Sequence, residues 1–172
     1  MNPDQNHFEL FGLPIGFDVD HAALDSRYRE LQREAHPDRY ASASQSEQWA
    51  SMQLATRINE AYRTLKSPVE RARYLLGLHG VDPEFETNTA MPQDFLAQQL
   101  ELREALEDAI DAESGEKLAG LRDRLQGGRG ALLLELEAQL GAKAWADAAG
   151  TLRRLMFMEK LGEEIAAAED EL

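Results

Sequence analysis

The chain has 172 residues, which is enough for one ordinary domain or two small ones. Its 18 basic and 32 acidic residues give a net charge of −14, which disfavours binding to nucleic acids and to anionic membranes because both are negatively charged. No cysteine is present, so disulfides, a thiol nucleophile, cysteine-type zinc sites and thiolate ligation of an iron–sulfur cluster are excluded.

The remaining composition argues against a metal site and against a targeting or membrane segment. Only four histidines are present, and none has a second histidine four positions away on a helix. The amino terminus lacks the basic start and apolar run of a signal peptide, and no segment approaches the roughly 18–20 apolar residues of a membrane helix. We therefore expect a cytoplasmic protein without a metal or other cofactor.

Helical periodicity runs through nearly the whole chain, and no segment shows the alternation typical of a strand. A short first helix with Phe8, Leu10 and Phe11 is predicted, and the segment Gly12-Leu13-Pro14 stops it. A second helix is expected to begin after Asp20, a suitable N-cap, and to end near Ala35, because Pro37 disfavours helical geometry at His36.

A polar segment, 40–46, then leads to a long third helix that is predicted to begin at Glu47. Its apolar residues predict a buried face made of Trp49, Leu54, Ile58, Ala61, Tyr62 and Leu65. Pro68 ends this helix, and a short fourth helix is expected over 69–76.

Residues 80–92 are acidic and rich in turn-forming residues, which predicts a linker between an amino-terminal domain, 1–79, and a carboxy-terminal domain, 93–172. The charge distribution supports this division. The first 79 residues hold 11 acidic and 9 basic residues, whereas the remainder holds 21 and 9. The excess negative charge therefore belongs to the carboxy-terminal domain.

The carboxy-terminal domain predicts three helices, over about 93–112, 116–140 and 143–170. The glycine-rich segment 127–130 lies inside the second of them, and each glycine costs about 1 kcal/mol in a helix interior. The leucines on either side nevertheless keep the same helical phase. One weakened helix is therefore favoured over two separate helices.

The tripeptide His36-Pro37-Asp38 follows the second helix, in the loop of an antiparallel helical pair. Pro37 fixes the chain direction, and Asp38 can accept a bidentate hydrogen bond from an arginine of a partner. Arg29 and Arg33 lie one turn apart on the same helix face and form a basic stripe that can steer an acidic partner. A catalytic role for the tripeptide is disfavoured, because no nucleophile, phosphate-binding loop or oxyanion donor accompanies it.

This motif and its flanking residues resemble the J-domain family over residues 4–76. The residues that carry the resemblance outside the motif are Tyr28, Arg29, Leu31, Arg33, Arg39, Tyr40, Ile58, Asn59, Glu60, Ala61, Tyr62, Leu65, Pro68, Arg71 and Tyr74. The resemblance implies docking on a DnaK-like chaperone ATPase in its ATP state and acceleration of ATP hydrolysis there. The residues that it implies for chaperone binding are Tyr28, Arg29, Arg33, His36, Pro37, Asp38 and Arg39. Glu30 stands where many J-domains carry a basic residue, which implies a thinner docking face and a specialised partner.

In the first carboxy-terminal helix, helical spacing predicts a core face made of Phe95, Leu102, Leu106, Ala109 and Ile110. The last helix has an apolar stripe formed by Trp145, Ala148, Ala149, Leu152, Leu155 and Met156, from which Phe157 is expected to project away. Leu96, Leu100 and Phe157 would form one apolar patch if these two helices are neighbours. From the pattern alone, a binding site, scattered surface residues and a dimer seam all remain open.

The segments 95–104, 145–149 and 154–157 resemble the HscB family of iron–sulfur cluster co-chaperones, and the similarity covers essentially the whole chain. The resemblance implies an all-α fold in which a J-domain precedes a three-helix bundle. It implies that a monomer binds an IscU-type cluster scaffold, delivers it to an HscA-type chaperone and promotes maturation of iron–sulfur proteins. The residues that it implies for scaffold binding are Leu96, Ala97, Leu100, Glu101, Glu104, Asp108 and Phe157.

Three other functions remain as alternatives. A general J-protein that delivers unfolded chains would carry a glycine-rich linker and zinc-binding cysteine repeats or a peptide-binding β-domain. An enzyme would need a catalytic constellation, and a J-domain that only docks would need an anchor. The sequence contains none of these features, so we expect a non-enzymatic co-chaperone.

Overall fold

The computed structural model describes residues 5–82 and 92–172, and every regular element in these ranges is helical. The predicted all-α class is therefore confirmed. The chain divides into two compact units between Leu75 and Leu76, and each unit is described by itself. Most of the expected linker, 80–92, lies outside the described residues. None of the described helices is long and apolar enough to cross a membrane.

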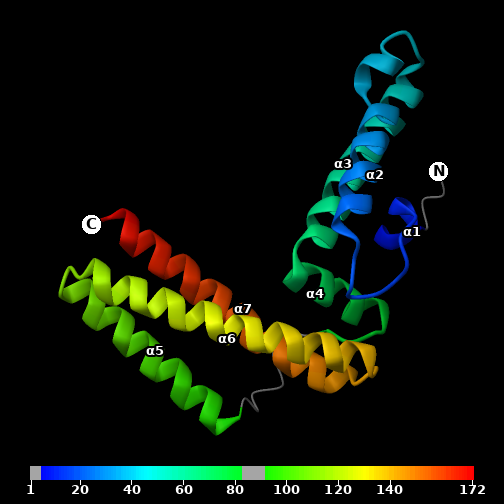
Figure 1. Cartoon of the computed structure of the whole chain (residues 1–172). Helices are drawn as coiled ribbons and strands as arrows, with labels where there is room; N and C mark the ends of the chain where they lie inside the picture. Colours follow the sequence, from blue (N-terminus) through cyan, green and yellow to red (C-terminus); the bar gives the residue numbers. More distant parts are fainter. Residues whose placement is uncertain (1–4, 83–91) are drawn as a thin grey trace. The chain divides into compact units, whose positions relative to one another are not determined.

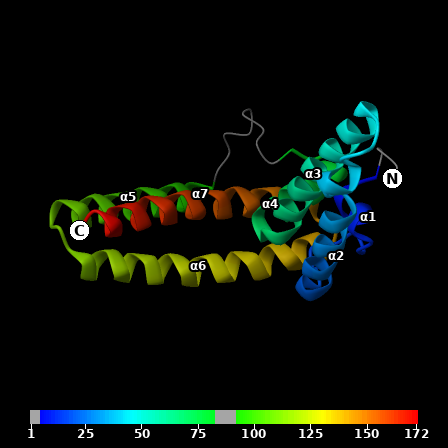
Figure 2. The same ribbon diagram turned by 90° about the horizontal axis from the view of Figure 1, so that it is seen from above.

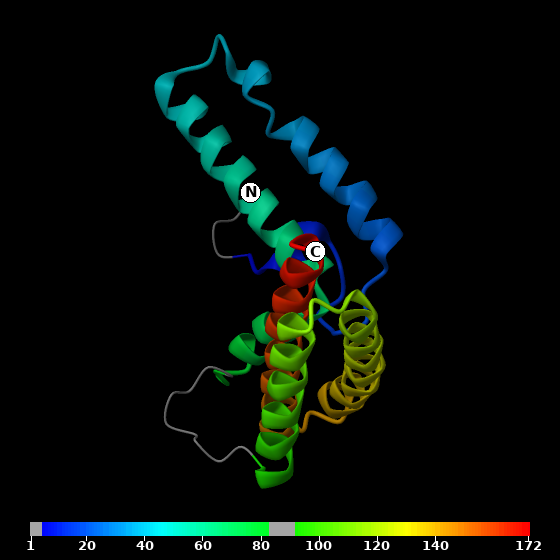
Figure 3. The ribbon, with the colours of Figure 1, turned by 90° about the vertical axis from the view of Figure 1, so that its left-hand side faces the viewer.

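The amino-terminal unit is built around a hairpin of two long antiparallel helices, α2 and α3 (Figure 1). Its elements are α1 (His7–Phe11), α2 (His21–Glu34), the 3₁₀ helix η1 (Pro37–Tyr40), α3 (Gln45–Lys66) and α4 (Pro68–Leu78), whose last residues belong to the second unit. Figure 3 shows that η1 lies at the tip of the hairpin, where α2 ends and the chain turns toward α3.

Side-chain caps explain where the two long helices begin. The Asp20 carboxylate accepts hydrogen bonds from two backbone amides of the first turn of α2, as predicted. Ser44 and Glu47 form a capping box in which each side chain accepts from the backbone amide of the other residue. Helix α3 therefore begins at Gln45, two residues before the predicted start, because Glu47 is the third residue of the helix rather than its first.

The core of the amino-terminal unit includes fully buried apolar side chains from three helices, among them Phe8, Leu24, Leu31, Ile58, Ala61 and Leu65. The prediction that Trp49 joins this core was wrong, since the Trp49 side chain is 63% exposed. Ser51 occupies the inward position instead, and its hydroxyl donates to the Ala35 carbonyl oxygen at 2.9 Å. Residues two apart on a helix face nearly opposite sides, so Trp49 points to solvent.

The carboxy-terminal unit is a bundle of three helices, α5 (Gln93–Asp111), α6 (Gly115–Gly141) and α7 (Trp145–Asp170). Figure 2 shows these helices running alongside one another. The prediction of a single middle helix was correct, because α6 continues through the segment 127–130. A Cβ atom on Gly128 would lie 3.1 Å from the Met158 Cε, so this glycine lets α6 and α7 approach closely.

The core of the bundle runs along all three helices and includes Leu102, Leu106, Ala109, Leu118, Leu121, Leu125, Met158, Leu161 and Ile165. Two parts of the predicted core were wrong. Ile110 is 47% exposed, because its neighbour Ala109 takes the inward position near the end of α5. Trp145 and Met156 are only half-buried, and the buried stripe of α7 continues instead through Met158 to Ile165.

Candidate functional site

The motif His36-Pro37-Asp38 opens η1 and is fixed by a local cap. His36 is the N-cap, and its Nδ1 accepts a hydrogen bond from the backbone amide of Asp38 at 3.2 Å. Pro37 is the first residue of η1, where a backbone amide is not needed. Because Nδ1 accepts, the neutral imidazole carries its proton on Nε2, which is left available to donate to a partner.

Side chains from beyond the motif hold the tip against the end of α2. Three successive carbonyl oxygens, those of residues 33–35, accept hydrogen bonds from Arg39, Tyr40 and Ser51 at 3.5, 3.3 and 2.9 Å. Carbonyl groups at the end of a helix have no partner within the helix. These bonds satisfy them and bind the loop and α3 to the place where α2 stops.

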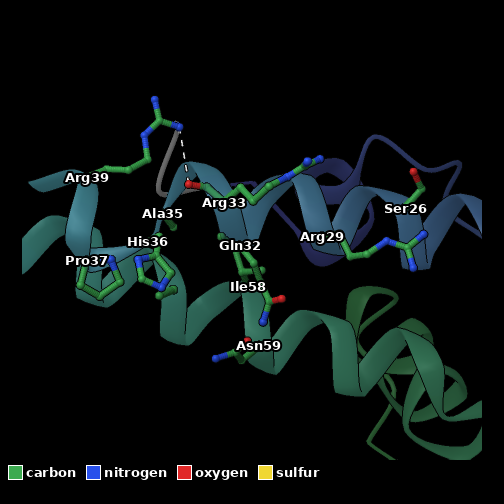
Figure 4. A pocket seen from close by; sticks show the side chains of 11 residues that line it. Ser26, Arg29, Gln32, Arg33, Ala35, His36, Pro37, Arg39, Ile58 and Asn59 are labelled. Carbon is green, nitrogen blue, oxygen red and sulfur yellow. Dashed lines mark hydrogen bonds between the residues drawn. The ribbon is translucent and has the colours of Figure 1, made fainter.

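A groove of about 770 Å³ lies between α2 and α3 next to the motif (Figure 4). It brings together five of the seven residues predicted for chaperone binding, namely Arg29, Arg33, His36, Pro37 and Arg39. Asp38 is outside the groove, and its side chain is 91% exposed at the tip. The groove also includes residues that the sequence analysis did not assign to the site, namely Ser26, Gln32, Ala35, Ala55, Ile58 and Asn59.

Tyr28, the seventh predicted residue, is half-buried and braces the hairpin. Its ring stacks on Tyr62 of α3 with centroids 3.9 Å apart, and its hydroxyl donates to Asn59 Oδ1 at 2.8 Å. The same hydroxyl accepts from Gln32 Nε2 at 2.6 Å. Tyr28 therefore positions the two walls of the groove instead of lining it.

A second cross-link joins the two helices farther from the tip. Asp25 accepts hydrogen bonds from Lys66 Nζ at 2.6 Å and from the Tyr62 hydroxyl at 3.0 Å. The Lys66 bond is the main cause that lowers the pKa of Asp25, and the same contact raises the pKa of Lys66. Together with Tyr28, this cross-link fixes the spacing of α2 and α3.

The groove wall on α2 is basic. Arg29 and Arg33 line it, and neither forms an ion pair with any carboxylate of the described residues. Glu30, which stands where a basic residue was expected, forms an ion pair with Arg27 at 3.1 Å. The Arg27 guanidinium therefore neutralises the Glu30 carboxylate, and the stripe of Arg29 and Arg33 keeps its positive charge.

Six of the seven residues predicted for scaffold binding occupy the exposed half of α5. Leu96 is 47% and Leu100 is 61% exposed. Arg103, one turn beyond Leu100, pairs with Glu164 of α7 at 3.3 Å, so this side of α5 borders α7. Glu101 pairs with Arg124 of α6 at 2.9 Å and marks the opposite border. The remaining predicted residues of α5, all exposed, lie between these borders: Ala97, Glu104 and Asp108.

Phe157 was expected to project away from the apolar stripe of α7, toward Leu96 and Leu100 if α5 and α7 are neighbours. The side chain is half-buried, and its ring meets Phe95 edge to face with centroids 5.9 Å apart. The Arg103 guanidinium lies 5.6 Å from the centre of the Phe157 ring. Arg103 was not among the predicted residues, although its spacing of three from Leu100 and seven from Leu96 places it on the same side of α5.

Comparison with known proteins agrees with this division of the chain. Residues 6–74 match the DnaJ domain family, and residues 91–166 match the family described as the HSCB C-terminal oligomerisation domain. The co-chaperone protein HscB homolog of Ralstonia nicotianae is 50% identical over 167 residues, which cover 96% of this chain and 95% of the relative. The chain belongs to the HscB co-chaperone family. Its resemblance to J-domain co-chaperones is thereby confirmed.

Other members of the HscB family are also similar to this chain over nearly its whole length. The homolog of Burkholderia multivorans is 46% identical over 97% of this chain and 95% of its own length. The structure of chaperone HscB from Vibrio cholerae matches with a TM-score of 0.85 and 38% identity, covering 97% of this chain and 99% of that one. Human co-chaperone protein HscB matches with a TM-score of 0.94 and 28% identity, covering all of this chain and 86% of the human one.

Proposed function

We propose that the amino-terminal unit docks on a DnaK-like, HscA-type chaperone in its ATP state and stimulates its ATPase. We further propose that the carboxy-terminal unit binds an IscU-type iron–sulfur scaffold and delivers it to that chaperone, which promotes cluster transfer and maturation of iron–sulfur proteins. The observation that carries the proposal is the His36-Pro37-Asp38 tip, fixed by its own cap beside a groove with a basic wall. Membership in the HscB family supports the pairing of this tip with the second unit.

The chemistry of the tip suits an acidic chaperone surface. Arg29, Arg33 and Arg39 are exposed and present guanidinium groups along or beside the groove. Guanidinium groups steer the approach of carboxylates and can bind them in a bidentate manner. Asp38, 91% exposed, can in turn accept from an arginine of the chaperone, and the His36 Nε2–H can donate a hydrogen bond beside it.

The chemistry of α5 suits a scaffold surface with an apolar centre and a basic rim. Leu96 and Leu100 are exposed on the side of α5 that borders α7, and they offer apolar area that a partner can cover. Glu104 and Asp108 are exposed on the adjoining side of the helix and can accept hydrogen bonds from basic side chains. Binding of this kind would leave any cluster ligands to the scaffold.

The test of the proposal is the His36→Gln variant. Glutamine lacks the ring nitrogen that caps η1, so the variant loses the fixed tip while α2 and α3 keep their contacts. We expect stimulation of the chaperone ATPase to be abolished and scaffold affinity, measured by calorimetry, to stay unchanged. The matched control is His21→Gln, which alters an exposed histidine at the start of α2 and should change neither quantity. Loss of both activities in His36→Gln would contradict separate sites.

A further inference from the structure

A chain of hydrogen bonds crosses the groove from α2 to α3. Gln32 Nε2 donates to the Tyr28 hydroxyl at 2.6 Å, and this hydroxyl donates to Asn59 Oδ1 at 2.8 Å. The Tyr28 ring is stacked on Tyr62, which holds its hydroxyl between the two amides. A tyrosine hydroxyl has one proton, so it accepts from one amide and donates to the other. The chain thus determines which atom of each amide is used inside the protein.

Each of the two amides has a second polar atom that faces no protein partner. Gln32 Oε1 is left as an acceptor and Asn59 Nδ2 as a donor, and neither is hydrogen-bonded within residues 5–82 and 92–172. Both residues line the groove, and Figure 4 shows Gln32 extending from α2 toward α3, where Asn59 lies. The groove therefore offers one neutral acceptor and one neutral donor beside the guanidinium groups of Arg29 and Arg33.

The chemistry of this pair selects the group that it binds. A carboxylate only accepts hydrogen bonds, and an ammonium or guanidinium group only donates them. Either group would leave one of the two groove atoms unpaired at the contact, which costs binding free energy. An amide carries a donor and an acceptor on separate atoms and satisfies both. The adjacent arginines attract carboxylates, so the groove as a whole matches an amide that lies close to a carboxylate.

We propose that Gln32 and Asn59 bind an amide group of the chaperone ATPase, next to the carboxylates that meet Arg29 and Arg33. The hydrogen bonds through Tyr28 orient the pair. Charge attraction alone admits many acidic surfaces, whereas this pair also requires a neutral donor and acceptor at a fixed place beside the charges. The inference rests on the proposed docking and adds to it two residues that determine which chaperone surface fits.

Chaperone ATPase rates measured against increasing concentrations of the intact chain test this role. Gln32→Met and Asn59→Leu replace each amide by an apolar side chain of similar size and leave the charge of the groove unchanged. Each is expected to raise the concentration for half-maximal stimulation about fivefold. The maximal rate should not change, because the tip is intact. Unchanged half-saturation in both variants would overturn the inference.

Gln53→Met is the matched control, since Gln53 is exposed on α3 and does not line the groove. This variant should leave the stimulation curve unchanged. Circular dichroism checks that each variant keeps its helices.

Tyr28→Phe separates binding of the chaperone from bracing of the hairpin. Phenylalanine keeps the ring stack on Tyr62 but lacks the hydroxyl, so both amides stay in the groove and lose only the bonds that orient them. If the amides bind the chaperone, Tyr28→Phe should raise the half-saturation less than Gln32→Met and Asn59→Leu combined. An equal rise, with an equal fall in thermal midpoint, would assign the amides to bracing alone and overturn the inference.

Nuclear magnetic resonance observes Asn59 directly in the unmodified chain. The chain has four asparagines, so ¹⁵N labelling of their side-chain nitrogens gives four amide signals, of which Asn59→Leu assigns one. Adding the chaperone with ATP should shift the Asn59 signal and leave that of Asn6, the N-cap of α1, in place. Normal stimulation with an unshifted Asn59 signal would overturn this inference alone. Absence of any stimulation by the unmodified chain would overturn the docking itself.

Labelling the chaperone instead identifies the source of its amide. With ¹⁵N in the side chains of its asparagines and glutamines, a signal shifted by the unmodified chain but not by Asn59→Leu would assign a side-chain amide. A shifted Asn59 signal without any such change in the chaperone would assign a backbone amide.

Discussion

His36 uses its two ring nitrogens for different tasks. Nδ1 accepts from the backbone amide of Asp38 and closes the start of η1, and Nε2 is left to donate outward. The residue is therefore part of the local fold and part of the proposed contact at once. Asp38 is positioned by the same hydrogen bond, so the three residues of the motif form one local structural unit.

At the residue scale, Leu96 and Leu100 test the scaffold site without disturbing the core. Both are exposed, so the double substitution Leu96→Ala, Leu100→Ala removes apolar contact area but leaves no cavity. We expect scaffold affinity, measured by calorimetry, to fall about tenfold or more. The thermal midpoint should stay within a few degrees of the unmodified chain.

Leu134→Ala is the control for this pair, since Leu134 is 70% exposed on a different helix. Equal affinity of the unmodified and the doubly substituted chain would show that the proposed patch is misplaced. Phe157 is a less suitable probe, because its ring packs on Phe95 and its removal would also loosen α5 against α7.

Residue exposure was the part of the site that the sequence predicted least well. Trp49 was placed on the buried face, although it lies nine residues before Ile58 and is thus half a turn out of phase with it. Ser51 lies seven residues before Ile58, takes the inward place and donates to the Ala35 carbonyl oxygen. The extent to which Phe157 is buried could not be predicted, because Phe95 and Arg103 of another helix lie against its ring. Helical spacing describes one helix, whereas such contacts depend on the side chains of its neighbour.

At the element scale, the sequence predicted which helices form and in what order. Capping side chains set the first residues of α2 and α3. The start of α3 at Gln45 could have been predicted, because Ser44 and Glu47 have the spacing of a capping box. The continuity of α6 was predicted correctly from the constant phase of its leucines. The close approach at Gly128 could not be predicted, because it depends on the position of Met158 on another helix.

The glycines of α6 give a prediction at this scale. A Cβ atom at Gly127 would meet nothing within 4 Å, so Gly127→Ala should raise the free energy of unfolding by about 1 kcal/mol through helix propensity. Gly128→Ala should gain less or lose stability, because its methyl group would press on Met158. Urea unfolding measures both variants. An equal gain for the two would contradict the close approach of α6 and α7.

At the scale of the whole molecule, the chain divides its charge and its proposed tasks between two units. The basic groove belongs to the first unit, and the exposed acidic and apolar face of α5 belongs to the second. Two modest contacts on one chain raise the effective concentration of the scaffold at the chaperone, without any additional contact. The account therefore requires both sites to be carried by the same chain.

Mixing two singly defective chains tests this requirement most directly. One chain carries His36→Gln and the other carries Leu96→Ala with Leu100→Ala, and the chaperone ATPase rate is measured with the scaffold present at a concentration that has little effect alone. With the unmodified chain, we expect the scaffold to raise the rate beyond the sum of the separate effects of chain and scaffold. The mixture should show no such excess, because neither chain joins a working tip to a working patch. A mixture that restores the rate of the unmodified chain would contradict delivery by a single tethering molecule.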